Sequence, residues 1–445
     1  MDACAAVVAI GRANGDQAAA LAGRALREAT RVGLDVPGMA DVACEAQEVL
    51  GSAARVRDLA AADSAFTSAL QVAERHGLPH RRLRALHELG SIDVLETFHV
   101  ERLARARQAA RAAGALATAA HVELNLAAVL TLRMRLDEGL DIAVGCERAA
   151  RRFAIGRVAP MALATQAVIH ALALRREEME AAITATLACP DVDDDIVAGL
   201  WGQARAEYSL GCEDRERAVA ELDTAMDHLR GRAGSPWPLR GLWAILHTLA
   251  GEDGDAARAQ VAGAPWGQIR INRAQLRYAD AIAAGRDGRP GRAVAAFAAA
   301  EREMAGLAGA DWMRHRARRL VAEAAVTDGW GEPAAWLRPA LDAFTRSGHR
   351  RSAVACRSLL RRLGESVPRG RTSLVPEALY QVGITAREMD VLRLLGEQLP
   401  NAEIARRLVI SPRTVEKHVE RLLAKTARAT RHELAGLAAR HDAAR

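Results

Sequence analysis

The segment SPRTVEKHVERLLAK, residues 411–425, has the side chains and spacing of a helix that binds a polyanion, and it holds both lysines of the chain. At 100° per residue one narrow arc predicts a buried seam of Val415, Val419, Leu422 and Thr426. The opposite arc carries a small residue among long polar ones: Arg413, Lys417, Glu420, Arg421 and Ala424. Cationic side chains donate to phosphates, and the major groove of DNA, about 12 Å wide, admits a helix. The pattern therefore indicates a helix that presents this polar arc to DNA.

Capping patterns divide residues 383–445 into four predicted helices, of which segment 411–425 is the third. The start signals are two capping boxes and two single caps, at Thr385 with Glu388, Thr430 with Glu433, Asn401, and Ser411. Pro412 suits the first position of the third helix, where a missing N–H costs nothing. Two short helices joined by a tight turn, the second polar outward, predict a helix-turn-helix at about 401–420.

The phrases ITAREMDVLRLL, NAEIARRLVIS, SPRTVEKHVERLLAK and RATRHELA occur in this order and at the right mutual spacing. Together they resemble the LuxR-type helix-turn-helix domain of bacterial transcription regulators. The resemblance implies a four-helix unit that binds double-stranded DNA with its third helix in the major groove. It also implies a fourth helix that supports a homodimer on two-fold sites.

The resemblance and the charges together give the predicted DNA-binding residues. These are Asn401, Arg406, Arg407, Ser411, Arg413, Thr414, Glu416, Lys417, His418, Glu420, Arg421, Lys425 and Arg428. The six arginines and lysines among them other than Lys417 are expected at phosphates, and His418 is expected to pack or to touch phosphate. Residues 383–445 hold twelve Arg and Lys against eight Asp and Glu, a net charge of 12 − 8 = +4. A four-helix module that makes only protein contacts is the alternative.

Two glutamates set this segment apart from its relatives. Several LuxR-type domains carry a base-reading lysine where Glu416 stands and a cation near Glu420. A glutamate accepts from cytosine N4 but repels phosphate. We therefore expect a DNA sequence preference that is this protein's own.

The longer N-terminal part is predicted to be helical throughout, because β-branched and aromatic residues are scarce and Ala is abundant. A phrase of Ala-x3-Phe before a Gly-containing turn recurs at Ala62 and Phe66, Ala149 and Phe153, Ala293 and Phe297, and Ala340 and Phe344. The phrase resembles the second half of a tetratricopeptide repeat, whose first half is poorly matched. The resemblance implies helical hairpins with a concave groove for a protein partner or a small-molecule effector. An irregular Ala-rich helical domain is the alternative.

The predicted fold class is therefore all-α, with a tetratricopeptide-like array followed by a LuxR-type domain. We expect the array over 1–360, a basic linker over 361–378, and the DNA-binding domain over 379–445. The chain resembles the C-terminal part of the large ATP-binding LuxR regulators. Their P-loop requires a lysine, and no lysine precedes residue 417, so the sequence encodes no P-loop ATPase.

Other chemistry has little support in the sequence. The cysteines are far apart and form no C-x-x-C pair: Cys4, Cys44, Cys146, Cys189, Cys212 and Cys356. The acidic stretch CPDVDDDIVAG, residues 189–199, fits a helix-capping loop better than a calcium loop. The glycines of GRDGRPGRA, residues 285–293, fit a loop between helices. The tryptophans concentrate at 201–336, mostly as predicted core, with a few as candidates for an effector groove. We expect no enzyme, no cofactor and no metal site.

The function expected from the sequence is sequence-specific transcription regulation, with RNA polymerase as a further partner to consider. A helical-repeat interaction scaffold with an accessory DNA-binding domain is the alternative. No stretch has the length and hydropathy of a signal peptide or a membrane span, so we expect a cytoplasmic protein that does not bind membranes.

Overall fold

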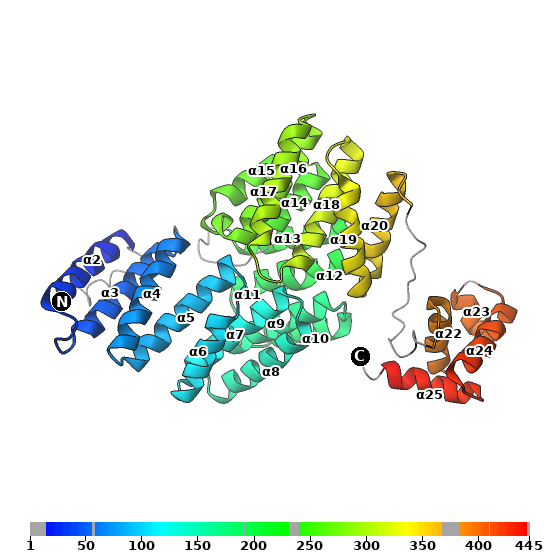
Figure 1. The fold of residues 1–445 in the computed structure, drawn as a ribbon, viewed down its shortest axis with the longest axis horizontal. Coiled ribbons are helices and arrows are strands. Elements are labelled where there is room, and N and C mark those ends of the chain that lie inside the picture. Colours follow the sequence, from blue (N-terminus) through cyan, green and yellow to red (C-terminus); the bar gives the residue numbers. More distant parts are fainter. Residues whose placement is uncertain are drawn as a thin grey trace. The chain divides into compact units, whose positions relative to one another are not determined.

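The computed structural model describes residues 15–55, 58–190, 192–230, 240–251, 253–366, 379, 382–408 and 410–442. Every regular element in these ranges is a helix, which confirms the all-α prediction. The chain forms two compact units, Met1–Ala340 and Leu341–Arg445 (Figure 1). Most of the predicted linker, residues 367–378, lies outside the described residues.

The first unit is a succession of antiparallel helices joined by short turns (Figure 1). Its helices are α2 (Gly15–Val32), α3 (Met39–Ala54), α4 (Leu59–Arg75), α5 (Pro79–Glu96), α6 (Glu101–Ala112), α7 (Leu116–Leu132), α8 (Leu136–Arg152), α9 (Val158–Leu172), α10 (Arg176–Leu187), α11 (Asp194–Gly199), the π-helix η1 (Leu200–Arg205), α12 (Ala206–Gly211), α13 (Arg215–His228), α14 (Arg240–Ala250), α15 (Gly254–Gly263), the 3-10 helix η2 (Pro265–Gln268), α16 (Arg270–Arg286), α17 (Pro290–Ala305) and α18 (Asp311–Asp328). The helices α19 (Pro333–Arg346) and α20 (Arg350–Arg362) follow, and the boundary between the units falls within α19. The segment GRDGRPGRA spans the turn between α16 and α17, as expected.

Alternate helices of the array bury one narrow stripe at positions i, i+4, i+7 and i+11, which lie within about 60° of one another at 100° per residue. The stripes are Ala18, Ala22, Ala25 and Ala29 in α2; Ala62, Phe66, Ala69 and Ala73 in α4; Gly139, Ala143, Cys146 and Ala150 in α8; and Ala293, Phe297, Ala300 and Met304 in α17. Small residues dominate these stripes, so the neighbouring helix can pack closely. The partner helices α7 and α9 are buried on more than one face. These features confirm a tetratricopeptide-like array of hairpins.

Glycines on the partner helices complete these close contacts. The Phe66 ring packs over Gly51, where an added Cβ would lie 2.7 Å from the ring. Leu103 packs over Gly90 in the same way, with an added Cβ 2.6 Å from its side chain. Each glycine follows a leucine, so the Leu-Gly pair typical of the first half of a tetratricopeptide repeat is present in α3 and α5.

One of the four predicted Ala-x3-Phe phrases is not part of the buried stripe. Phe153 follows the last residue of α8 and is 45% exposed. The residues that occupy the Ala and Phe positions in α8 are Gly139 and Ala143, ten residues earlier. The prediction that Ala149 and Phe153 belong to the buried stripe was wrong. The motif matches the repeat in sequence, but its Phe lies beyond the end of α8.

A late helix of the array, α16, also contacts an early one, α5. The backbone N–H of Arg270, at the start of α16, donates to the Glu96 carboxylate at the end of α5, with N and Oε1 3.1 Å apart. The guanidinium of Arg273 also pairs with Glu96, at 3.4 Å. Beside these contacts the N–H of Ala308 donates to the carbonyl of Thr97 over 2.7 Å. The start of α16 is therefore fixed against a helix that lies far earlier in the chain.

We predict that Phe66→Ala lowers the free energy of unfolding of the array by about 3–5 kcal/mol, because it leaves a cavity over Gly51. Phe153→Ala is the matched control and should change it by less than about 0.5 kcal/mol, since the ring is exposed. Urea denaturation followed by tryptophan fluorescence reports on this unit, because all the tryptophans lie between 201 and 336. Equal effects of the two changes would contradict this assignment of the stripe.

Candidate DNA-binding surface

Four helices around a separate core carry the predicted DNA-binding residues: α22 (Ala386–Gly396), α23 (Asn401–Leu408), α24 (Pro412–Thr426) and α25 (Arg431–Asp442). The core joins α22 to α24 and α25 through aliphatic side chains such as Leu392, Ile404, Val415, Leu422 and Leu434. The four helices lie where the capping patterns place them. A tight turn between α23 and α24 gives the helix-turn-helix arrangement.

The caps are mostly as predicted. Thr385 and Glu388 form a reciprocal capping box at the start of α22. Ser411 Oγ accepts from the N–H of Thr414 over 3.1 Å at the start of α24. At α25, Thr430 accepts from the N–H of Glu433, but the Glu433 carboxylate accepts from Ala429 and not from Thr430.

The expected cap at Asn401 was wrong. The first helical hydrogen bond of α23 runs from the N–H of Ile404 to the carbonyl of Pro400, so Asn401 lies within the first turn. Its side-chain oxygen instead accepts from Arg431 Nη1 of α25 over 2.5 Å. Asn401 therefore ties α23 to α25.

The two arcs of α24 are confirmed. Val415 and Leu422 are fully buried, and Val419 packs against the same core. The exposed arc carries Arg413, Glu416, Lys417, Glu420, Arg421 and Ala424. Among the described residues, none of the five charged side chains in this arc forms an ion pair or a side-chain hydrogen bond. The helix therefore presents unneutralised charge on a face that its own caps and core hold in place.

Charge on this arc is arranged in two rows. Arg413, Lys417 and Arg421 recur at i, i+4 and i+8 and so form a cationic row along the helix. Glu416 and Glu420 form a shorter acidic row beside it. Such a surface favours a phosphate backbone on one side and groups that donate hydrogen bonds on the other.

The arginines of α23 are exposed but paired. Arg406 is 77% exposed and lies 2.5 Å from a Glu403 oxygen, and its hydrogen bond lowers the pKa of that carboxyl. Arg407 pairs with Glu397 at 2.6 Å. Exposed pairs of this kind contribute little to stability, so both guanidinium groups can exchange a carboxylate for a phosphate.

Lys425 makes contacts within the domain that the sequence pattern did not indicate. Its ammonium group lies 2.6 Å from a Glu388 oxygen and 2.7 Å from the carbonyl of Gly383. The Glu388 side chain is only 2% exposed. Burial acts to raise the pKa of Glu388, but hydrogen bonds from Lys425 and Thr385 outweigh it, so the pKa lies below its usual value. Lys425 therefore joins α24 to the start of α22.

His418 also faces inward. It is half-buried, its Nδ1 atom is buried, and burial lowers the pKa of the ring. The packing alternative for this residue is therefore the one that the structure supports.

Two arginines that the sequence did not single out position the helix-turn-helix. Arg387 of α22 donates to the carbonyl of Leu408, the last residue of α23, over 2.6 Å. Arg431 of α25 donates to the carbonyl of Leu399 as well as to Asn401. Both act on backbone or amide groups at the ends of α23. A pattern of charges along one helix gives no sign of such contacts.

The other sequence candidates have structural roles. In the acidic stretch 189–199, Asp193 caps α11 by accepting from the N–H of Ile196, which confirms the capping interpretation. Trp243 and Trp330 are buried, as predicted for core residues. Trp201 stacks under the guanidinium of Arg205, 4.4 Å from ring centroid to Cζ. None of the helices in the described part of the chain is long and apolar enough to cross a lipid bilayer.

Residues 383–438 match the sequence profile of bacterial regulatory proteins of the luxR family. A Mycobacterium bovis protein is 43% identical to the chain over 72 residues, which is 16% of this chain and 8% of that protein. Proteins of Mycobacterium tuberculosis strains CDC 1551 and H37Rv are 43% and 42% identical over 72 residues, with the same coverage. The names of all three propose an HTH-type transcriptional regulator. The chain spans less than a tenth of the length of these relatives, and its C-terminal part is a LuxR-family helix-turn-helix domain.

The two lysines of α24 give a matched test of this geometry. We predict that Lys425→Met destabilises the domain by about 1–3 kcal/mol, because it removes a donor from a buried carboxylate. Lys417→Met should have little effect, since the side chain is exposed. Hydrogen exchange of peptides from α22 and α24 in the full chain measures both changes. Similar protection in the two variants would contradict the inward role of Lys425.

Acid should weaken the same contact. The folded pKa of Glu388 lies below its unfolded value, so its contribution to stability is present above the unfolded pKa, about 4.3. That contribution is lost as the pH falls through the folded pKa. We expect exchange protection of α22, corrected for intrinsic rates, to fall at acid pH, and to fall less in Lys425→Met.

Proposed function

We propose that this chain is a transcription regulator that binds double-stranded DNA with α24 in the major groove, and that its helical array binds an effector or a protein partner. The observation that supports it most is the exposed arc of α24, where Arg413, Lys417 and Arg421 have no ion-pair partner among the described residues. The LuxR-family match over residues 383–438 and the names of the mycobacterial relatives point the same way.

We propose different tasks for the predicted residues. Lys417 lies at the middle of the exposed arc and is placed to donate to a base edge. Arg413, Arg421 and Arg428, with Arg406 and Arg407 of α23, are placed for phosphates. Ser411 and Thr414 hold the start of α24, since their hydroxyl oxygens lie 2.8 Å apart. We assign Asn401, His418 and Lys425 to the stability of the domain.

The glutamates contribute to sequence preference. Glu416 and Glu420 repel phosphate, so the acidic row of α24 must face the interior of the groove for the helix to dock. There a carboxylate accepts from the N4 amine of cytosine, which favours C·G pairs at the positions that it meets. We further propose that two copies bind half-sites spaced about 34 Å apart, one turn of the DNA helix, as dimeric helix-turn-helix proteins do.

The chain offers matched variants to test this assignment. Lys417→Ala should weaken binding to the preferred site by about 1–3 kcal/mol and relax selectivity, with little effect on random DNA. Arg428→Ala should weaken binding to both DNAs alike and reduce the slope of log affinity against log salt by about 1. Fluorescence anisotropy at several salt concentrations measures both.

The controls separate direct from indirect effects. Lys425→Ala should reduce binding only in proportion to the fraction of domain that unfolds, and added stabilising osmolyte should restore it. Equal losses on preferred and random DNA for Lys417→Ala would reassign it to phosphate. Selectivity that no variant of the exposed arc alters would favour a scaffold whose DNA-binding domain is accessory.

A further inference from the structure

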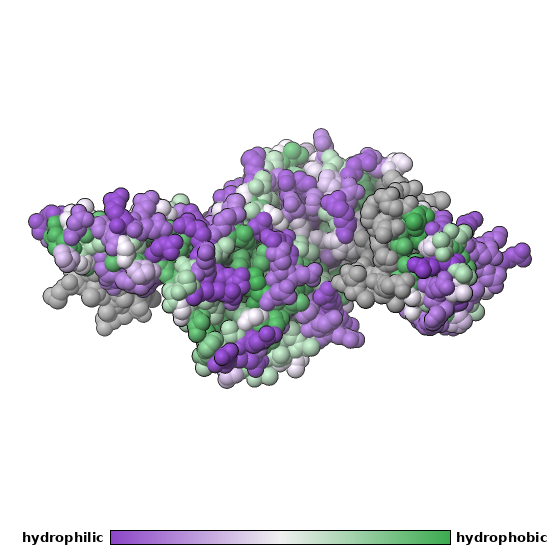
Figure 2. Space-filling view, turned by 60° about the horizontal axis from the view of Figure 1, so that its bottom comes forward, coloured by the Kyte–Doolittle hydropathy of each residue, from purple (hydrophilic) through white to green (hydrophobic). Residues whose placement is uncertain are grey.

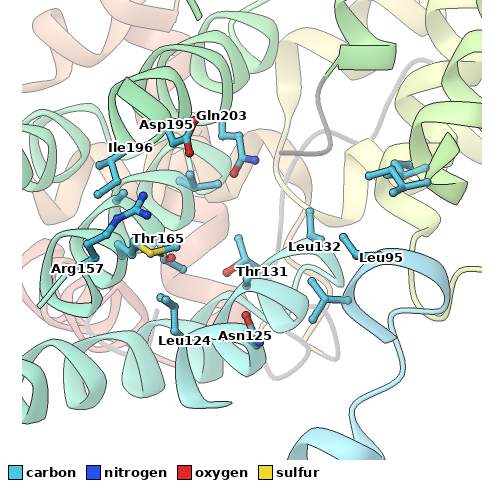
Figure 3. Close-up of a pocket in the computed structure, with 18 residues that line it drawn as sticks. Leu95, Leu124, Asn125, Thr131, Leu132, Arg157, Thr165, Asp195, Ile196 and Gln203 are labelled. Atoms are coloured by element: carbon cyan, nitrogen blue, oxygen red, sulfur yellow. Dashed lines mark hydrogen bonds between the residues drawn. The ribbon is translucent and has the colours of Figure 1, made fainter. Parts of the chain in front are cut away.

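We propose that a cavity in the helical array binds a neutral, mainly apolar small molecule that carries one group able both to donate and to accept a hydrogen bond. The cavity has a volume of about 300 Å³. Helices α5, α7, α9, α11 and η1 and the start of α16 line it (Figure 3). The proposal deepens the effector-binding part of the proposed function and rests on it for its regulatory meaning.

Most of the wall is aliphatic. Leu95 and Leu132 lie on one side of the cavity and Ile196 on the other, as Figure 3 shows. Ile269, just before α16, and Ile271, within its first turn, also line the cavity. Figure 2 shows that the visible surface is largely hydrophilic, with apolar side chains reaching it in the middle of the helical unit. A volume of this size with apolar walls suits a small ligand. Of the tryptophans whose side chains are described, none lines the cavity.

Several polar side chains in the wall already have partners. The hydroxyl of Thr131 donates to the carbonyl of Ala127 over 2.7 Å, and Thr165 donates to Met161 over 2.9 Å. The amide nitrogen of Asn125 donates to Ser91 Oγ over 3.2 Å. These groups therefore do not require a hydrogen bond from a ligand.

Two polar atoms in the wall have no partner. Gln203 is only 8% exposed, and its Nε2 atom is buried without an acceptor among the described residues. Asp195 Oδ1 is likewise buried without a donor. Figure 3 places both side chains on the same side of the cavity, opposite Leu124 and Asn125. A buried polar atom without a partner is rare and costly, so a donor and an acceptor facing one apolar cavity indicate a ligand.

The local backbone explains how Gln203 reaches the cavity. Residues 200–205 form the π-helix η1, and such insertions are frequent at functional sites. Gly202 faces α13, where an added Cβ would lie 3.0 Å from that of Ala225. The next residue, Gln203, lines the cavity. The extra residue in the turn thus lets one helix pack tightly on α13 and present an amide to the cavity.

The unpaired atoms define the polar group of the ligand. Asp195 Oδ1 requires a donor and Gln203 Nε2 requires an acceptor, and an amide or a hydroxyl supplies both. A carboxylate would be repelled by Asp195. An ammonium group would satisfy Asp195 but leave Gln203 Nε2 unpaired. At the rim, Arg157 forms an ion pair with Asp193 at 2.5 Å.

The test uses the full chain without DNA and the neutral fluorophore N-phenyl-1-naphthylamine, whose N–H can donate to Asp195. We expect saturable binding. Ala128→Phe places a ring from α7 in the cavity and should weaken binding of the fluorophore at least tenfold. Ala295→Phe on the exposed side of α17 is the matched control and should leave it unchanged. Unchanged affinity in Ala128→Phe, with the fold verified by circular dichroism, overturns the proposal, as does a wild-type chain that binds no probe.

Competition with three compounds of one shape tests the polar group. Adamantane-1-carboxamide should displace the probe at concentrations at least tenfold lower than adamantane-1-carboxylate or 1-adamantylmethylammonium. Gln203→Leu should weaken binding of the carboxamide by about three- to tenfold, the value of one hydrogen bond, and reduce its advantage over the ammonium compound by the same factor. A carboxylate that competes as well as the carboxamide overturns the proposal.

The outcome is independent of DNA binding. Wild type and Ala128→Phe should bind DNA with equal affinity in the absence of probe, because the DNA-binding residues all lie in the other unit. Probe binding without selective DNA binding would overturn the proposed function alone. Selective DNA binding without probe binding would overturn the cavity proposal alone.

Discussion

Close contact between helices at small residues is the constraint on which the helical array depends. The stripe at i, i+4, i+7 and i+11 allows two helix axes to lie close together only if the facing helix also has small side chains at the contact. Gly51 beneath Phe66 and Gly90 beneath Leu103 meet this requirement. Because each hairpin packs in the same way on the next, the partner helices turn their remaining faces toward a common interior. Helices α5, α7 and α9 line the cavity from this interior.

The C-terminal domain follows a different rule, since its small core is supported by polar contacts between helices. Lys425, Arg387 and Arg431 each join two elements through a carboxylate, an amide or a backbone carbonyl. These hydrogen bonds and ion pairs fix the orientation of α24 on the core. The exposed arc of the same helix forms no ion pair with any residue that the structure describes. Within one helix of fifteen residues, Lys425 therefore serves stability while Lys417 is free for a ligand.

The sequence predicted the parts that depend on periodicity and local capping. The all-α class, the four C-terminal helices, the capping box at Thr385 and the two arcs of α24 were all predictable, because they depend on residues a few positions apart. It could not predict contacts that depend on tertiary structure. Lys425 meets a carboxylate 37 positions earlier, and Asn401 meets Arg431 across 30 positions. The prediction for Phe153 was wrong because a short sequence motif does not determine where a helix ends.

The central claim is that α24 reads a DNA sequence. The most direct measurement is selection of bacterial genomic fragments by the purified full chain at physiological salt, followed by sequencing of the bound fragments. The structure predicts enrichment of a two-fold motif whose half-sites are centred about one helical turn apart, with C·G pairs where Glu416 and Glu420 meet the groove. Recovery of fragments in proportion to their abundance, with no motif above background, would contradict it.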